Sequence, residues 1–194
     1  MKEIIIATSN SHKIDEFKRI LKGIKISSLK DIGYYDEIEE DGNTFEENAL
    51  IKARTVAEKI GKTVIADDSG LEIYALNNEP GIYSARYLGH DTPYEVKNSI
   101  IIDRLKNVPE EERGARFVCC IAMANPDGSS EIFRGEFDGY IAHKPAGENG
   151  FGYDPIFYLP EYGMTAAELE PDVKNSISHR GKAIQKLFEK LRGN

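Results

Sequence analysis

The chain has 194 residues, of which 40% are hydrophobic and 30% charged, and its formal net charge is −8 at pH 7. This composition is typical of a soluble globular domain, and it excludes a membrane-spanning protein because no apolar run approaches the roughly 20 residues that a bilayer requires. The acidic balance excludes a general coat for polymeric nucleic acid, which needs a basic face to neutralise phosphates. A length of 194 residues predicts one domain, 1–194, with two lobes.

The cysteines and the N-terminus predict a cytoplasmic protein. Cys119 and Cys120 are adjacent in an apolar run, so we expect them as buried strand residues in a reducing compartment. The first residues lack the basic start, long apolar stretch and small-residue cleavage site of a secretory signal.

The first 22 residues predict a strand, a polar loop and a helix. Residues 3–7 form a continuous β-branched run typical of a buried strand, and the polar turn 8–11 follows it. Ile14, Phe17 and Leu21 then recur at helical spacing. This order directs the N–H groups of a helix N-terminus at whatever occupies the loop, which favours an anion.

An acidic stretch separates the next strand from the second helix. The strand is predicted at 25–29, and residues 31–47 then hold eight carboxylates and no basic residue. Thr44 and Glu47 have the spacing of a capping box, which predicts a helix that ends at Gly61.

Paired carboxylates follow the third predicted strand. Residues 63–66 are apolar, and we expect Asp67-Asp68-Ser69-Gly70 to break the strand before it resumes at 71–76. Two carboxylates at a strand end suit a divalent cation, particularly Mg²⁺. The same four residues also suit a solvated β-turn.

The second half of the chain alternates between strands and helices. We expect a helix at 94–106, a hairpin of strands 116–124 and 131–143, a short strand at 156–159 and a basic helix at 178–192. A mixed α/β fold follows, with helices packed on an extended sheet.

The glycine-rich loop Gly147–Pro155 is the most unusual segment. It lacks the position and spacing of a dinucleotide-binding fingerprint, and no Walker A sequence is present. Its glycines would let the backbone approach a flat ligand, with Phe151 and Tyr153 stacking on it and Asp154 accepting hydrogen bonds. The alternative is a turn that places two aromatic residues in the core.

Basic residues stand beside the possible anion sites. Lys13 ends the first polar loop, Lys52 lies within the second helix, and Lys174 and Ser178-His179-Arg180 precede or begin the last helix. Taken singly these are surface lysines and a serine cap. Taken together with the carboxylates and the aromatic loop, they indicate a nucleoside triphosphate site.

Five separated motifs resemble those of the inosine triphosphate pyrophosphatase family, whose members are XTP/dITP diphosphatases. In chain order they are Thr8-Ser-Asn-Ser-His-Lys13, Glu47-Asn-Ala49 with Lys52-Ala53, Ala66-Asp-Asp-Ser-Gly-Leu71, Phe151-Gly-Tyr-Asp-Pro-Ile-Phe157 and Ser178-His-Arg180. The resemblance covers the chain from residue 3 to the last helix.

The resemblance implies an elongated mixed β-sheet flanked by helices, with two lobes and an active-site cleft between them. It implies Mg²⁺-dependent hydrolysis of ITP, dITP and XTP to monophosphate and pyrophosphate by a homodimer. Two other functions fit the same features: a pyrophosphatase for modified pyrimidine nucleotides, and a nucleotide-binding module without catalysis.

The resemblance also assigns roles to residues. Asp68 would be the general base and a metal ligand, with Glu39 as the second metal carboxylate and Glu40 as the alternative. The substrate-binding residues would be Thr8, Ser9, Asn10, Ser11, His12, Lys13, Lys52 and Ser69 at the phosphates, and Phe151, Gly152, Tyr153, Asp154, Lys174, His179 and Arg180 at the base and ribose.

Overall fold

The structure, a computed structural model, describes residues 3–193 of the chain. Its internal contacts define two compact units, each built from separate stretches of sequence. Unit 1 contains the described residues of Met1–Asp68, Cys119–Gly135 and His179–Asn194, and unit 2 contains Ser69–Val118 and Glu136–Ser178.

Within the described residues the sheet has eight strands: seven follow the order β2-β1-β3-β5-β6-β7-β8, and β4 pairs with β3. The strands are β1 (Glu3–Ile6), β2 (Lys25–Ser28), β3 (Val64–Ile73), β4 (Glu79–Pro80), β5 (Gly114–Ala124), β6 (Ser130–Ile141), β7 (Phe157–Leu159) and β8 (Met164–Thr165). The α-helices are α1 (Ser11–Ile20), α2 (Phe45–Ile60), α3 (Tyr94–Arg104), α4 (Pro171–Ile177) and α5 (His179–Arg192). Short 3₁₀ helices are η1 (Lys30–Ile32), η2 (Tyr74–Leu76), η3 (Gly81–Arg86), η4 (Glu110–Glu112) and η5 (Asp154–Ile156). Strand β1 runs parallel to β2 and β3, whereas β7 is antiparallel to β6 and β8, so the pairing is mixed.

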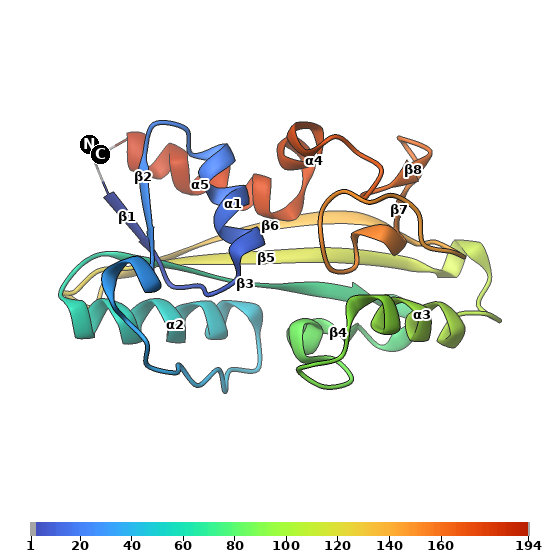
Figure 1. Cartoon of the computed structure of the whole chain (residues 1–194), viewed down its shortest axis with the longest axis horizontal. Helices are drawn as coiled ribbons and strands as arrows, with labels where there is room; N and C mark the ends of the chain where they lie inside the picture. Colours follow the sequence, from blue (N-terminus) through green and yellow to red (C-terminus); the bar gives the residue numbers. More distant parts are fainter. Residues whose placement is uncertain (1–2, 194) are drawn as a thin grey trace. The chain divides into compact units, whose positions relative to one another are not determined.

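In unit 1, helices α1 and α5 lie on one face of the strands and α2 lies on the other (Figure 1). Alternate residues of β1 turn Ile4 and Ile6 toward the same core as Phe17 of α1 and Ile184 of α5. Helix α2 starts where the capping box predicts, because Thr44 Oγ1 accepts a hydrogen bond from Glu47 N at 3.1 Å. Its buried stripe has the spacing of one helix face: Ala49, Ala53, Val56 and Ala57.

Unit 2 has its own hydrophobic core, in which aromatic rings from three strands meet. The Phe157 ring centroid lies 4.4 Å from that of Phe117 and 5.5 Å from that of Phe137. Arg113 is fully buried beside this core, and its guanidinium donates to the carbonyl oxygens of Leu105, Ile141 and Ala142. These bonds join the residue that follows α3 to the end of β6, so that α3 is held against the strands.

The predicted fold class is confirmed: the structure is a mixed α/β protein with helices flanking a mixed sheet. The hairpin of β5 and β6 is present, with a turn at Asn125–Gly128, where Gly128 N donates to Asn125 O at 3.0 Å. Cys119 and Cys120 are free and buried in β5, and burial raises the pKa of Cys119 to about 12. Among the described residues, no helix is both long and apolar enough to cross a membrane.

The break expected at residues 67–70 was wrong. Strand β3 continues through Asp67, Asp68, Ser69 and Gly70, and the chain leaves the strand only at Ile73. Turn-forming residues can remain in a strand when their polar groups find partners. Both aspartates are buried in β3 and pair with cations from helices of unit 1. The interpretation as a solvated turn therefore fails.

Candidate functional site

The loop between β1 and α1 is shaped by its own side chains. Asn10 caps α1, because its Oδ1 accepts a hydrogen bond from Lys13 N at 3.2 Å. Asn10 N in turn donates to Thr8 Oγ1 at 3.2 Å. Ser9, Ser11 and His12 are exposed around this turn. The arrangement presents hydroxyl groups and a helix N-terminus to solvent, which is a suitable environment for phosphate oxygens.

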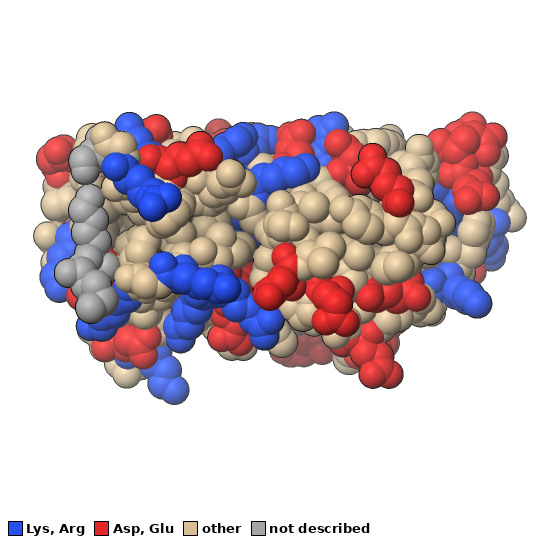
Figure 2. Space-filling view, turned by 90° about the horizontal axis from the view of Figure 1, so that it is seen from above, with Lys and Arg blue, Asp and Glu red and all other residues tan. Residues whose placement is uncertain are grey.

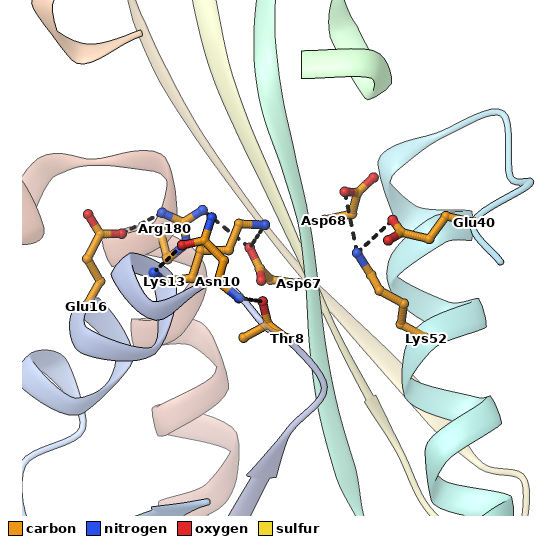
Figure 3. Close-up of polar contacts among 9 residues, drawn as sticks. All are labelled: Thr8, Asn10, Lys13, Glu16, Glu40, Lys52, Asp67, Asp68 and Arg180. Carbon is orange, nitrogen blue, oxygen red and sulfur yellow. Dashed lines mark hydrogen bonds and ion pairs between the residues drawn. The ribbon is translucent and has the colours of Figure 1, made fainter. Parts of the chain in front are cut away.

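Asp67 holds two cations on one side of β3 (Figure 3). Its Oδ2 lies 2.9 Å from Lys13 Nζ and 3.3 Å from Arg180 Nη2, and Arg180 also pairs with Glu16 of α1. Burial by itself raises the pKa of Asp67, but Lys13 and Arg180 outweigh burial and lower it well below its ordinary value. Asp67 is therefore ionised. The ion pairs among Asp67, Lys13, Arg180 and Glu16 join α1, β3 and α5.

Asp68 points to the opposite side of β3, as neighbouring residues of a strand must. There Lys52 of α2 lies between two carboxylates: its Nζ is 3.6 Å from Asp68 Oδ1 and 2.8 Å from Glu40 Oε2 (Figure 3). Burial raises the pKa of Asp68, and the attraction of Lys52 only partly opposes it. Burial lowers the pKa of Lys52, but Asp68, Asp67 and Glu40 outweigh this and raise it.

Asp68, on this side of β3, has a side-chain oxygen that could still bind a metal ion. Asp68 Oδ2 is buried and has no hydrogen-bond partner within the described part of the chain. Glu40 is half-buried beside Lys52, whereas the neighbouring Glu39 is exposed. No group of three or more His, Cys, Asp or Glu residues in the described chain forms a metal site. Mg²⁺, however, commonly takes one or two carboxylates together with waters and substrate phosphates, and Asp68 with Glu40 fits that set.

Asp154 organises the glycine-rich loop in unit 2. Its Oδ2 accepts hydrogen bonds from Phe151 N at 2.8 Å and from Lys174 Nζ of α4 at 2.6 Å, and both charged residues are buried. Lys174 Nζ also lies 5.4 Å from the Phe151 ring centroid. Gly150 has a φ of +76°, and a Cβ there would come within 2.2 Å of Asp154 Oδ2. The loop therefore needs glycine at position 150 to fold around this carboxylate.

The two aromatic residues of the loop have different environments. Tyr153 belongs to the core of unit 2 and donates from its hydroxyl to Ser84 O at 2.7 Å. Burial raises the pKa of its phenol. Phe151 is only half-buried. The expected alternative, a turn that places its aromatic residues in the core, is therefore correct for Tyr153. It is not correct for Phe151, which retains an accessible surface.

His179 and Arg180 begin α5, and both are buried. Gly135 of β6 allows this helix to approach the strand, because a Cβ at that position would lie 2.1 Å from His179 O. Ser69 follows Asp68 along β3 and is half-buried. Most residues assigned from the sequence are therefore in an ion pair, buried at the start of a helix or in one of the two polar loops. The exceptions are Ser69, which lies in β3, and Glu39, which is exposed in the acidic stretch before α2.

Sequence reasoning missed three partners of these residues. Asp67 was noted only as part of a motif, although it is the carboxylate that Lys13 and Arg180 share. Glu16 was not considered, although it lies three residues after Lys13 and hence on the same helix face. Glu40 was expected only as the alternative metal carboxylate, and its ion pair with Lys52 was not anticipated.

These features define a mixed α/β protein with buried ion pairs beside a polar loop at a helix N-terminus. The model of the Ham1 family matches residues 4–190 of the chain. The dITP/XTP pyrophosphatase of Bacillus subtilis (strain 168) is 49% identical over 193 residues, which cover 98% of each chain. That of Staphylococcus aureus (strain MRSA252) is 47% identical and covers 100% of this chain and 98% of its own.

Solved structures agree with the sequence comparisons. A HAM1 protein from Coxiella burnetii superposes with a TM-score of 0.91 at 42% identity, over the whole of both chains. The Ham1 protein of Staphylococcus aureus has a TM-score of 0.88 at 47% identity, over 99% of both chains. The chain belongs to the Ham1 family, which confirms the resemblance drawn from the five motifs.

Proposed function

We propose that this protein hydrolyses non-standard purine nucleoside triphosphates (ITP, dITP and XTP) to the monophosphate and pyrophosphate, and so removes them from the nucleotide pool. The observation that carries the proposal is Asp68, a buried carboxylate with a raised pKa and an unpartnered oxygen, beside Lys52 and Glu40. The names of relatives that match nearly the full length support the same activity.

The phosphate-binding role falls to the first loop and to two neighbouring segments. Thr8, Asn10 and Lys13 belong to the hydrogen-bonded turn between β1 and α1, around which Ser9, Ser11 and His12 are exposed, and we assign the phosphates to this turn. Lys52 and Ser69 would hold further phosphate oxygens. Phosphoryl chemistry depends chiefly on positioning and on neutralising charge, and these groups supply both.

Asp68 is the proposed general base and a ligand of Mg²⁺. When bound, Mg²⁺ neutralises phosphate charge and lowers the pKa of a coordinated water. Asp68 would orient the attacking water and accept its proton. For the second carboxylate, the contact with Lys52 favours Glu40, and the exposed Glu39 is the alternative.

The glycine-rich loop is the proposed reader of the purine base. Hypoxanthine and xanthine carry an N1–H donor and a 6-oxo acceptor, and adenine reverses both. A carboxylate such as Asp154 accepts from N1–H, and the cation of Lys174 is adjacent to it. Adenine would leave buried polar groups unpaired, a mismatch that supports discrimination of about 10⁴-fold. Phe151 would stack on the base beside Gly152, and Tyr153 would support the loop from the core. His179 and Arg180 are the proposed further base and ribose contacts.

We also propose a cytoplasmic homodimer that does not bind polymeric nucleic acid. Unit 2 exposes large apolar side chains, including Tyr83, Leu88 and Val96, which a second copy would cover. The face drawn in Figure 2 intersperses Lys and Arg with Asp and Glu, unlike the continuous basic surface that a long polyanion requires. Sedimentation analysis tests the dimer, and a monomer at micromolar concentration would contradict it.

A substrate panel with product identification tests the activity. Purified protein with Mg²⁺ is expected to convert ITP into IMP and pyrophosphate, to act on XTP and dITP, and to lose activity when EDTA is added. ATP, GTP and pyrimidine triphosphates run in parallel. Production of IDP and phosphate, or equal turnover of ATP, would contradict the proposal. Preference for a modified pyrimidine would favour the related alternative.

A further inference from the structure

Helix α3 buries two polar side chains that the proposed chemistry does not use. Lys97 and Asn98 are buried, whereas the adjacent Val96, Ser99 and Ile100 are exposed. Asn98 Nδ2 donates to Gly152 O at 3.1 Å, a bond that links α3 directly to the glycine-rich loop. A buried polar residue on a helix face that could be apolar calls for a reason other than packing.

The loop is also supported around this bond. Tyr94, in the first turn of α3, contacts Tyr153 edge to face with ring centroids 5.2 Å apart. Its ring also faces Gly152, where a Cβ would lie 3.6 Å from Tyr94 Cε1. Tyr153 is then fixed at its far end by the hydrogen bond from its hydroxyl to Ser84 O. Gly152 and Tyr153, the two residues that the Gly152 carbonyl joins, thus both pack against Tyr94 of α3.

Residues of η3 also take part in the hydrogen bonds that support the glycine-rich loop. Ser84 Oγ accepts a hydrogen bond from Leu71 N of β3 at 2.9 Å and donates to Gly81 O. Lys97 Nζ donates to Ala85 O at 2.7 Å and lies 4.7 Å from the Tyr94 ring centroid. Strand β3, η3, α3 and the glycine-rich loop are therefore connected by buried and partly buried hydrogen bonds in unit 2.

Among the residues that support the glycine-rich loop, Asn98 is distinguished by a polar side-chain atom that lacks a hydrogen-bond partner within the described chain. Its Oδ1 is buried and has no hydrogen-bond partner among residues 3–193. A buried acceptor without a donor is destabilising, and an apolar side chain of similar size would avoid this cost. The bond from Nδ2 to Gly152 O is therefore the single hydrogen bond that this side chain makes among the described residues.

We propose that Asn98 is a positioning residue that sets base preference through Gly152. By holding the Gly152 carbonyl, it fixes the loop backbone between Phe151, whose ring would stack on the base, and Asp154, whose carboxylate would accept from N1–H. The inference rests on the proposed base-reading role of this loop. Without Asn98, half-buried Gly152 can turn its carbonyl toward water, and the loop loses its defined position.

The test compares Asn98→Leu with the parent protein. Leucine has a similar size and suits a buried position, but it cannot donate to Gly152 O. We expect KM for ITP to rise more than kcat falls. We expect the ratio of kcat/KM for ITP to that for ATP to fall by about 10- to 100-fold, the range expected for a small misplacement of the substrate. Hydrogen exchange of the Phe151 amide, which donates to Asp154, should become faster.

Three further variants make every result decisive. Ser99→Ala alters an exposed neighbour on the same helix and should match the parent in all three measurements. Asn98→Ser, which is too short to reach Gly152 O, replaces Asn98→Leu if the leucine variant does not fold. Asp154→Asn tests the loop's base-reading role, because it removes the negative charge and replaces one carboxylate oxygen with an NH2 donor that opposes N1–H.

A folded Asn98 variant with parental KM, base preference and Phe151 exchange would overturn the inference. If Asp154→Asn changes base preference and the Asn98 variant does not, the inference alone fails. If Asp154→Asn leaves base preference unchanged, the proposed role of the loop fails, and the inference fails with it.

Discussion

Asp67 and Asp68 are neighbours on one strand, and the structure gives them opposite electrostatic environments. Asp67 shares Lys13 and Arg180, and its pKa is lowered despite complete burial. Asp68 has Lys52, which it shares with Glu40, and burial raises its pKa. The difference separates two tasks. Asp67 is an ionised carboxylate that anchors two cations, whereas Asp68 has the raised pKa and the unpartnered oxygen expected of the proposed base.

The largest expected effect is on turnover. Asp68→Asn removes the proposed base while keeping the shape of the side chain, so kcat for ITP should fall by about 10²- to 10⁴-fold. Nucleotide binding, followed by calorimetry, should persist because the groups proposed for the phosphates are untouched. Turnover equal to that of the parent would remove Asp68 from the role of base.

Asp67→Asn should act mainly on stability. It leaves Lys13 and Arg180 facing a neutral amide in a buried site, and loss of one partner from a buried ion pair costs about 3–5 kcal/mol. Urea unfolding of the parent, Asp67→Asn and Asp68→Asn measures the contrast. A loss of stability in Asp68→Asn as large as that in Asp67→Asn would break the distinction between the two carboxylates.

The acidic pair offers a matched comparison for the metal. Glu40→Gln should raise the Mg²⁺ concentration needed for half-maximal activity by about tenfold or more, because loss of a proposed ligand should weaken metal binding at least as much as loss of a group behind a ligand does. Glu39→Gln, which changes the exposed neighbour in the same way, serves as the control. The reverse order of effects would show that Glu39 is the second carboxylate, as the family resemblance first implied.

The smallest expected effect is on the pH dependence of stability in Mg²⁺-free buffer. The pKa of Asp67 lies below its ordinary value in the folded protein, so the unfolded chain binds more protons at that site. Its contribution to stability is therefore present above about pH 4 and is lost as pH falls toward the lowered pKa.

Asp68 should contribute with the opposite sign. Its raised pKa means that the unfolded chain releases the proton first, so stability falls as pH rises from the ordinary pKa toward the raised one. Urea unfolding across the acid range should show a shallower acid loss for Asp67→Asn. At neutral pH, Asp68→Asn should be at least as stable as the parent. Identical pH profiles for the two variants would contradict the electrostatic assignment.

Much of the fold was predictable because local signals are strong in this chain. The capping residues Thr44 and Glu47 and the Asn125–Gly128 turn give the right start of α2 and the right hairpin. Asp67 to Gly70 were misread as a break, since four residues that favour turns outweigh the apolar residues on either side. Their charges are tolerated in β3 only because Lys13, Arg180 and Lys52 come from helices distant in sequence.

The motifs marked candidate site residues but not the partners of those residues. The motifs marked Lys13, Lys52, Asp68 and Arg180, and they indicated an anion and a metal. They did not distinguish Glu40 from Glu39, because both belong to one acidic run and differ only in the direction of their side chains. Nor did they mark Asn98, whose bond to Gly152 spans 54 residues of sequence.

The sequence by itself determined the family, the mixed α/β class and the residue types that the chemistry requires. Those properties follow from composition, local periodicity and ordered motifs. Only the tertiary structure decided which of the two adjacent aspartates is held ionised by two cations and which has a raised pKa. The reason is physical: the pKa of a buried carboxylate depends on the charges that folding brings near it, and successive side chains of a strand meet different helices on its two faces.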